Sequence, residues 1–145
     1  MRNKETIKKE LRSLVKRVKS GAFSNRDMVD FGRITKTHAD KIKRNTGIKV
    51  HGYRRVIFAS EVKHIIRKHG RGNEKQKNQI GVTTTDLISL PDLFSGVSSI
   101  RLEKTKDGLR AIKHVRNSKN NIFIVEVVRT GRKQLAIKTM YKKRK

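Results

Sequence analysis

Apolar positions in the first third of the chain recur at the spacing of helices. Between residues 3 and 19 they lie three or four residues apart opposite a Lys- and Arg-rich face, which predicts an amphipathic helix that ends near Gly21. These apolar positions are Ile7, Leu11, Leu14, Val15 and Val18. Residues 24–34 show no clear period, and a second helix is expected from residue 37 to residue 45, before Gly47.

The middle of the chain pairs a strand with a helix. Residues 52–58 are predicted to form the strand, and Ser60 with Glu61 provides a helix N-cap and an acidic first turn. This helix is expected to end at Gly70. Residues 71–79 are polar without apolar periodicity and are expected to form an exposed, mobile loop.

Beyond residue 80 the pattern changes from short helical segments to strands. A short helix is expected to begin within residues 83–86, and Pro91 to break it or to start a further turn. Four strands are then predicted at 98–104, 109–116, 121–129 and 133–141, with glycine-containing hairpin turns at 106–108 and 130–132. N-terminal helices followed by a four- to five-stranded antiparallel sheet indicate an α+β fold.

The charge balance restricts the class of partner. The chain has 38 Lys and Arg residues against 12 Asp and Glu, a formal net charge of +26. Such a charge favours a polyanionic partner, because neutralising phosphates releases their counterions. Nucleic acid is the favoured partner over an anionic membrane surface, and no apolar run reaches the roughly 18 residues of a membrane span.

Cysteine is absent, which excludes disulfides and thiolate metal sites. The charged N-terminal segment has no apolar stretch of the kind found in signal peptides, so a cytoplasmic site of action is expected. Acidic residues are few and scattered, without the carboxylate cluster of a two-metal nuclease, and no metal or other cofactor is expected.

The segment around His64 and His69 is the first candidate for chemistry. Histidine suits proton transfer near neutral pH, and neighbouring cations favour its neutral form, which acts as a base. The alternative is that both histidines are exposed or cap the helix. The candidate nucleic-acid-binding cations are Lys63, Arg67, Lys68, Arg71, Arg116 and Lys142.

The last predicted strand is the second candidate. Thr139 and Tyr141 lie on one face of it, where they would bind a phosphate or stack on a base, or simply be ordinary strand residues. Lys113 on an earlier strand would contact a phosphate. Glu126, an acid in an otherwise apolar strand, would orient a His or Arg of the site or form a plain buried ion pair.

In their order along the chain these segments resemble the phage-associated barnase–EndoU–colicin–RelE-like (BECR) nucleases. The resemblance rests on residues 47–53, 63–70, 82–86, 125–127 and 135–141. They correspond to a His…His-Gly helix, a Thr-x-x-Asp turn and a sheet that closes with a Thr-x-Tyr strand.

The resemblance implies a metal-independent ribonuclease, often deployed as a toxin. Carried over, His64 and His69 would be the acid/base pair, Thr139 and Tyr141 would line the phosphate site, and Glu126 and Lys113 would support it. Residues 1–36 would form a basic helical extension and residues 37–145 the nuclease domain. The expected partners are RNA, with tRNA as one candidate, and an acidic antitoxin or immunity protein.

Two other functions fit parts of the sequence. A noncatalytic nucleic-acid-binding protein on a nuclease-like fold would need the charge but no histidine. A metal-dependent DNase would need carboxylates that the sequence does not gather.

Overall fold

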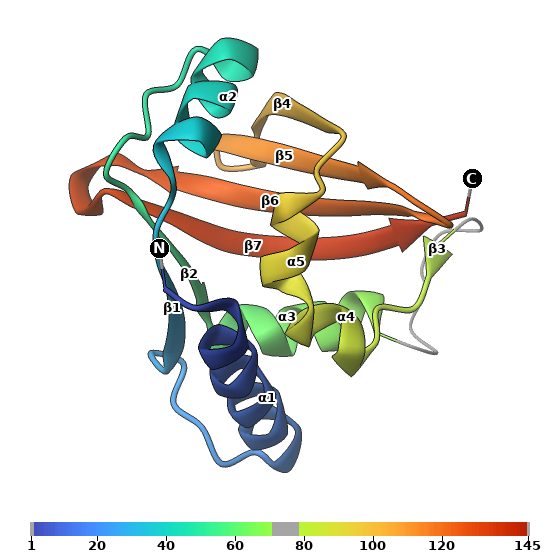
Figure 1. The fold of residues 1–145 in the computed structure, drawn as a ribbon. Coiled ribbons are helices and arrows are strands. Elements are labelled where there is room, and N and C mark those ends of the chain that lie inside the picture. The colour runs from blue at the N-terminus through green and yellow to red at the C-terminus, as the bar shows by residue number, and fades with distance from the viewer. Residues whose placement is uncertain (1, 71–78, 145) are drawn as a thin grey trace.

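The computed structural model describes residues 2–70 and 79–144 (Figure 1). The helices are α1 (Lys4–Ser20), α2 (Lys36–Thr46), α3 (Ala59–His69), α4 (Thr84–Ile88) and α5 (Leu90–Ser95), with a short 3-10 helix at Thr130–Arg132. The strands are β1 (Met28–Arg33), β2 (Arg54–Phe58), β3 (Gln79–Ile80), β4 (Ser99–Lys104), β5 (Arg110–Asn117), β6 (Asn121–Arg129) and β7 (Gln134–Lys143). The predicted α+β class and the four-stranded meander at its end are confirmed. Among the described residues, none of the helices combines the length and apolar character needed to cross a membrane.

The strands form one sheet in the order β1-β2-β7-β6-β5-β4, and β3 pairs with the far end of β7. All pairs are antiparallel except β2–β7, which is parallel. The last strand of the chain, β7, therefore lies in the centre of the sheet, between β6 and β2. Its register with β6 shifts between Val125 and Glu126, which leaves Lys138 as an extra residue in β7.

Strand β1 was not predicted from the sequence, because a β-bulge interrupts its alternation of apolar and polar residues. Its register with β2 shifts between Asp30 and Gly32, and Gly32 adopts a φ of 89°. The shift leaves Phe31 without a partner on β2, and the side chains of Val29 and Phe31 are both buried. A period of two is lost where the bulge inserts a residue, so residues 24–34 give no readable strand signal.

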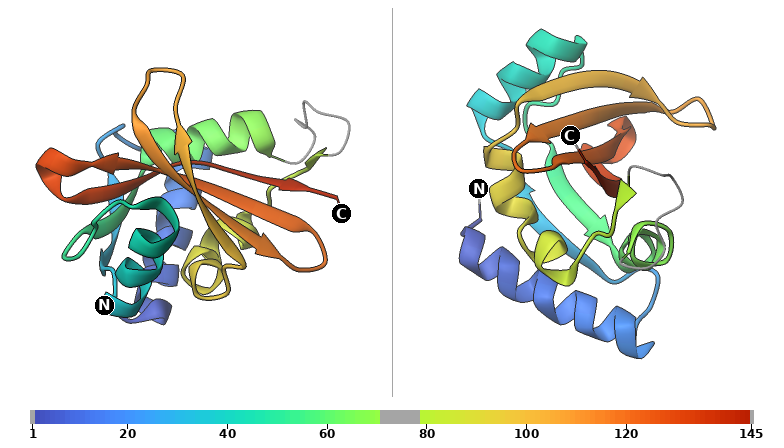
Figure 2. Two further views of the ribbon diagram at one scale, coloured as in Figure 1. Left: turned by 90° about the horizontal axis from the view of Figure 1, so that it is seen from above. Right: turned by 90° about the vertical axis from the view of Figure 1, so that its right-hand side faces the viewer.

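The two faces of the sheet differ in what covers them. Side chains of β6 alternate between buried and half-buried along its whole length. We call the face of the buried positions, such as Ile124, the inner face; α1 and α5 cover it. Figure 2 (right) shows α1 and α5 on one side of the sheet and α3, seen nearly end-on, beside its edge. The half-buried positions, such as Phe123 and Val125, define the outer face.

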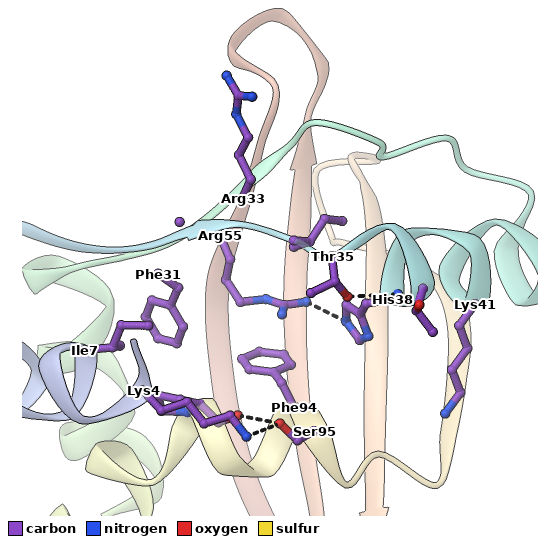
Figure 3. A pocket seen from close by; sticks show the side chains of 14 residues that line it. Lys4, Ile7, Phe31, Arg33, Thr35, His38, Lys41, Arg55, Phe94 and Ser95 are labelled. Carbon is purple, nitrogen blue, oxygen red and sulfur yellow. Dashed lines mark hydrogen bonds between the residues drawn. The ribbon is translucent and has the colours of Figure 1, made fainter. Parts of the chain in front are cut away.

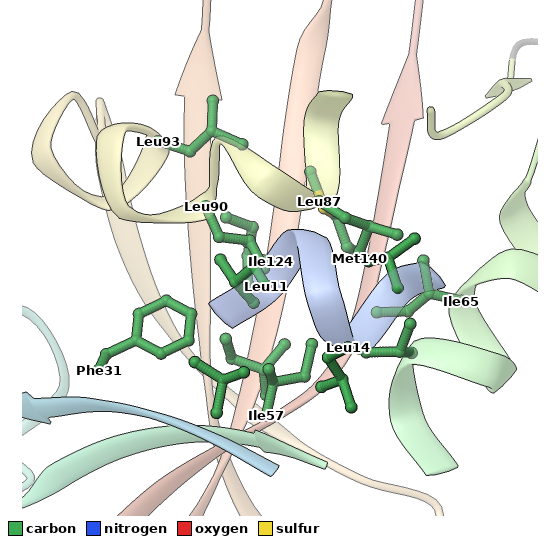
Figure 4. Packing of buried hydrophobic residues seen from close by; sticks show 14 of the residues in the cluster. Leu11, Leu14, Phe31, Ile57, Ile65, Leu87, Leu90, Leu93, Ile124 and Met140 are labelled. Atoms are coloured by element: carbon green, nitrogen blue, oxygen red, sulfur yellow. The ribbon is translucent and has the colours of Figure 1, made fainter. Parts of the chain in front are cut away.

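Two apolar clusters fill the inner face. The larger joins α1, α3, α4 and α5 to the sheet, and Figure 4 shows Leu11, Leu14, Ile65 and Met140 within it. The smaller lies under α2 at the other end of the sheet. Along β6, Ile124 belongs to the larger cluster and Val128 to the smaller, and the charged residue Glu126 lies between them.

Helix α1 belongs to this core and has well-formed ends. The Asn3 side chain caps its start, and Gly21 ends it in the left-handed region with φ of 80°. All five apolar positions that the sequence pattern singles out are buried. Residues 4–33, most of the predicted extension 1–36, therefore contribute α1 and β1 to the same larger cluster as the meander.

We expect Leu14→Ala in α1 to lower the free energy of unfolding by about 2–5 kcal/mol, because it leaves a cavity where a fully buried side chain was. Urea denaturation measures this change. Arg12→Ala, on the exposed side of the same helix, is the control and should stay within about 0.5 kcal/mol of the parent. Equal stability of the two variants would contradict the placement of α1 in the core.

Candidate active site

Helix α3 brings His64 and His69 beside the edge of the outer face. Its buried side, Ala59, Val62 and Ile65, packs into the larger cluster, and the two histidines are half-buried. The helix stops at Gly70, where a Cβ would lie 2.2 Å from the Ile66 carbonyl oxygen. The His-Gly pair thus reflects a close backbone contact that only glycine allows.

The ring of His69 is held between β3 and β7. Its Nδ1 lies 3.3 Å from Oε1 of the buried Gln79, and its backbone oxygen accepts a 2.6 Å hydrogen bond from Val82. The His69 and Tyr141 rings lie 5.6 Å apart, and Tyr141 stacks on Phe123 with ring centres 4.8 Å apart. Three segments that are distant in sequence therefore meet at His69.

Cross-strand register extends this group across the outer face. Thr139 lies opposite Val125, which in turn lies opposite Lys113, and directly opposite residues share a face. The Lys113 Nζ is 5.3 Å from the centre of the Phe123 ring and 3.4 Å from Glu103. Burial lowers the pKa of Lys113, but hydrogen bonds to Tyr141 and Glu103 and their charges raise it overall, so its amine is charged at neutral pH.

The electrostatics of α3 favour a neutral His64. The pKa of His64 lies below its ordinary value because the ring is half-buried and because Lys68, His69 and Lys138 lie nearby. Lys138 owes this position to the bulge in β7. The sequence-based expectation that neighbouring cations favour the neutral form agrees with this shift.

The hydroxyl group of Thr139 lies in an unusual environment for a buried polar group. Its Oγ1 is buried and has no hydrogen-bond partner among the described residues. Buried hydroxyls are nearly always paired, so an unpaired one on the same face as Lys113 and Tyr141 is a candidate ligand contact.

Other predicted site residues lie elsewhere. Arg116 donates to the Asp92 carbonyl at 3.0 Å, and Lys142 pairs with Asp86 at 2.8 Å; both belong to the inner-face side of their strands. The remaining predicted cations of α3, Lys63, Arg67 and Lys68, are exposed. Arg71, with most of the predicted loop 71–79, lies outside the described residues, and Gln79 of that loop is buried in β3.

Glu126 lies on the inner face, away from the α3 histidines, in a buried polar network. Arg55 Nε donates to Glu126 Oε2 at 2.6 Å and Arg55 Nη2 to Oε1 at 2.9 Å, and His114 Nε2 lies 2.6 Å from the same Oε1. The Arg55 Nη2 is also 3.1 Å from His38 Nε2. Of the two roles expected for Glu126, the structure shows the buried ion pair, with Arg55.

The charges in this network follow from its burial. Burial alone would raise the pKa of Glu126, but Arg55 and His114 hold it well below its ordinary value. Burial and Arg55 lower the pKa of His38 to about 3, and burial lowers the pKa of His114 in spite of Glu126. The network is therefore one ion pair flanked by two neutral histidines.

Sequence reasoning missed His38, Arg55, His114 and Phe123. The isolated acid in an apolar strand was a signal that a cation or histidine is near Glu126, but it does not say which one. Phe123 gave no signal beyond strand propensity, because its stacking partner Tyr141 becomes visible only through the β6–β7 register.

No group of three or more His, Asp or Glu side chains that could hold a metal ion occurs among the described residues. No curated protein and no solved structure matches the chain. Residues 32–145, from the end of β1 onward, match the family described as phage-Barnase-EndoU-ColicinE5/D-RelE like nuclease3. This confirms the resemblance inferred from the ordered segments, and the chain belongs to this phage-associated BECR nuclease family.

Proposed function

We propose that the protein is a metal-independent endoribonuclease whose active centre is the outer-face group around His69 and Tyr141. The observation that carries the proposal is the 5.6 Å approach of these two rings, which links the α3 histidines to the Thr139–Tyr141 strand. Membership of a nuclease family and the net charge of +26 support it.

The proposed reaction needs only proton transfer and charge stabilisation. Neutral His64 accepts the proton of the ribose 2′-hydroxyl, whose oxygen attacks the adjacent phosphorus. His69, in its protonated form, donates a proton to the departing 5′-oxygen, and the product keeps a 2′,3′-cyclic phosphate. The charged Lys113, with the hydroxyls of Thr139 and Tyr141, stabilises the negative charge that develops on the phosphate oxygens.

Phe123 and Tyr141 add a second property to this face. Their stacked rings are half-buried, and the Lys143 Nζ lies 5.8 Å and 5.7 Å from the two ring centres. A flat aromatic surface beside cations suits an unpaired base and its phosphate. We therefore expect the substrate to be a single-stranded segment, such as a loop of tRNA.

The producing cell would need protection from such an enzyme. An acidic antitoxin or immunity protein that covers the outer face fits the charge of the chain and would block the proposed centre. The enzyme would then act in the cytoplasm of the bacterial host or of a target cell.

The proposal is tested by incubating the purified protein with total tRNA and a fluorescent single-stranded RNA in excess chelator. We expect discrete cleavage that leaves 2′,3′-cyclic phosphate ends. Cleavage that requires a divalent metal would contradict the mechanism. Tight, salt-sensitive binding of both RNAs without cleavage would instead identify a binding protein on a nuclease fold.

The pH dependence of cleavage gives a further prediction. Because the pKa of His64 lies below its ordinary value of about 6.5, the base stays neutral and kcat/KM should persist as the pH falls below that value. Lys138→Gln removes a nearby cation, so the pKa of His64 rises and the acidic limb moves to higher pH. Lys106→Gln, in the exposed β4–β5 turn, is the control. Superimposable pH profiles for the two variants would contradict the assignment of the acidic limb to a base beside Lys138.

A further inference from the structure

A second candidate site lies on the inner side of the molecule. A cavity of about 270 Å³ opens between the starts of α1 and α2 and the end of α5 (Figure 3). Its lining includes Phe31, His38, Lys41, Arg55 and Phe94. None of the proposed nuclease residues lines it, so it is separate from the outer-face group.

The cavity is strongly cationic. Lys4, Arg33, Lys41 and Arg55 line it, and no Asp or Glu is among its described lining residues. Arg55 is paired with Glu126 and Lys4 lies 3.8 Å from Asp92, whereas the Lys41 Nζ donates to the Val97 carbonyl at 3.3 Å and pairs with no carboxylate among the described residues. Within the part of the chain that the structure describes, the charges of Lys41 and Arg33 are therefore not balanced by an ion pair.

The buried network forms one wall of this cavity and fixes its geometry. Arg55 is 5% exposed, and its guanidinium carbon lies 3.6 Å from the centre of the Phe94 ring. Two hydrogen bonds to Glu126 prevent the guanidinium from turning away. His38 accepts from Arg55 in its neutral form, and Figure 3 shows both side chains directed toward each other at the cavity wall. A preformed wall of this kind reduces the ordering cost of binding.

Helix α2 adds an electrostatic contribution. Thr35 caps its N-terminus by accepting from the His38 amide, and Thr35, Thr37 and His38 all line the cavity. The positive end of the 11-residue helix is therefore directed to the same space as Lys41. Ile7, Phe31 and Ile34 provide an apolar part of the lining.

From the cavity, its uncompensated cations and its apolar wall, we propose that this site binds a small organic phosphate. The phosphate contacts Lys41, Thr37 and the α2 N-terminus, and the organic part lies against Phe31 and Ile34. A volume of about 270 Å³ is at the lower end for small-molecule sites, which limits the ligand to about one nucleotide. The proposal does not depend on the ribonuclease activity.

Isothermal titration calorimetry with AMP, inorganic phosphate and adenosine, at physiological salt, tests the proposal on the full chain. We expect saturable AMP binding that phosphate competes for and that adenosine reproduces only weakly. Lys41→Glu should weaken AMP binding at least tenfold. Lys43→Glu makes the same charge change on an exposed position of α2 that does not line the cavity, and should bind as the parent does.

The His64→Ala/His69→Ala double variant separates this site from the nuclease centre. We expect it to bind AMP as the parent does. Loss of AMP binding in this variant but not in Lys41→Glu would place the anion on the outer face and overturn the proposal. Equal weakening by Lys41→Glu and Lys43→Glu, adenosine binding as tight as AMP binding, or no saturable AMP binding would also overturn it.

Discussion

Replacement of His64 or His69 by Ala is expected to lower the rate of RNA cleavage by about 10²–10⁴-fold, because each removes one proton-transfer group. The double variant should be little slower than the slower single one, since residues that act as a unit are not additive. Single-turnover cleavage of a labelled RNA measures the rates. RNA binding, measured by fluorescence anisotropy, should change little.

His51→Ala is the matched control. His51 is exposed in the segment between α2 and β2, and its Nε2 lies 2.7 Å from Asp40 Oδ1, so its loss should leave cleavage unchanged. Circular dichroism of each variant excludes loss of folding as the cause. Full activity of either the His64 or the His69 variant would remove that residue from the proposed mechanism.

Glu126→Gln is expected to lower the free energy of unfolding by about 3–5 kcal/mol, because it leaves Arg55 as a buried charge without its counterion. Urea denaturation at neutral pH measures the change. Glu10→Gln makes the same substitution in a surface pair with Arg2 and should cost about 0–1 kcal/mol. Similar losses for the two variants would contradict a structural role of the buried pair.

The same pair has a defined pH dependence. The pKa of Glu126 is lower in the folded state than in the unfolded state, where a glutamate titrates near ~4.3. Its contribution to stability is therefore fully present above that unfolded value and declines as the pH falls below it. Between about pH 5 and pH 8, this pair should therefore add almost no slope to the unfolding free energy of the parent protein.

The sequence pattern predicted the elements with regular periods. The α1 face, the strand β2 and the four strands of the meander were all identified, because α1 has a clear helical period and the strands are apolar stretches bounded by turn residues. Strand β1 was missed because its bulge at Phe31 interrupts the alternation. The two-residue strand β3 is too short to carry a period, and it forms only because β7 provides its partner.

Only part of the proposed active site could be predicted from the sequence. Periodicity placed Thr139 and Tyr141 on one face, and the family resemblance linked them to His64 and His69. The position of Glu126 relative to these residues was beyond a single sequence, because the bulge and the inner-face burial of even-numbered β6 residues decide it. The partners of Glu126 come from β2 and β5, and only the three-dimensional strand order brings them together.

The central place of β7 in the sheet has a consequence during synthesis on the ribosome. Until residues 134–143 leave the exit tunnel, the β1–β2 pair and the β4–β6 meander each present an open edge with no strand between them. The nascent chain also lacks Thr139 and Tyr141 for that interval. A chain of this order therefore keeps the proposed centre incomplete until β7 has been made, and its partly made sheets are the stage at which chaperones would bind it.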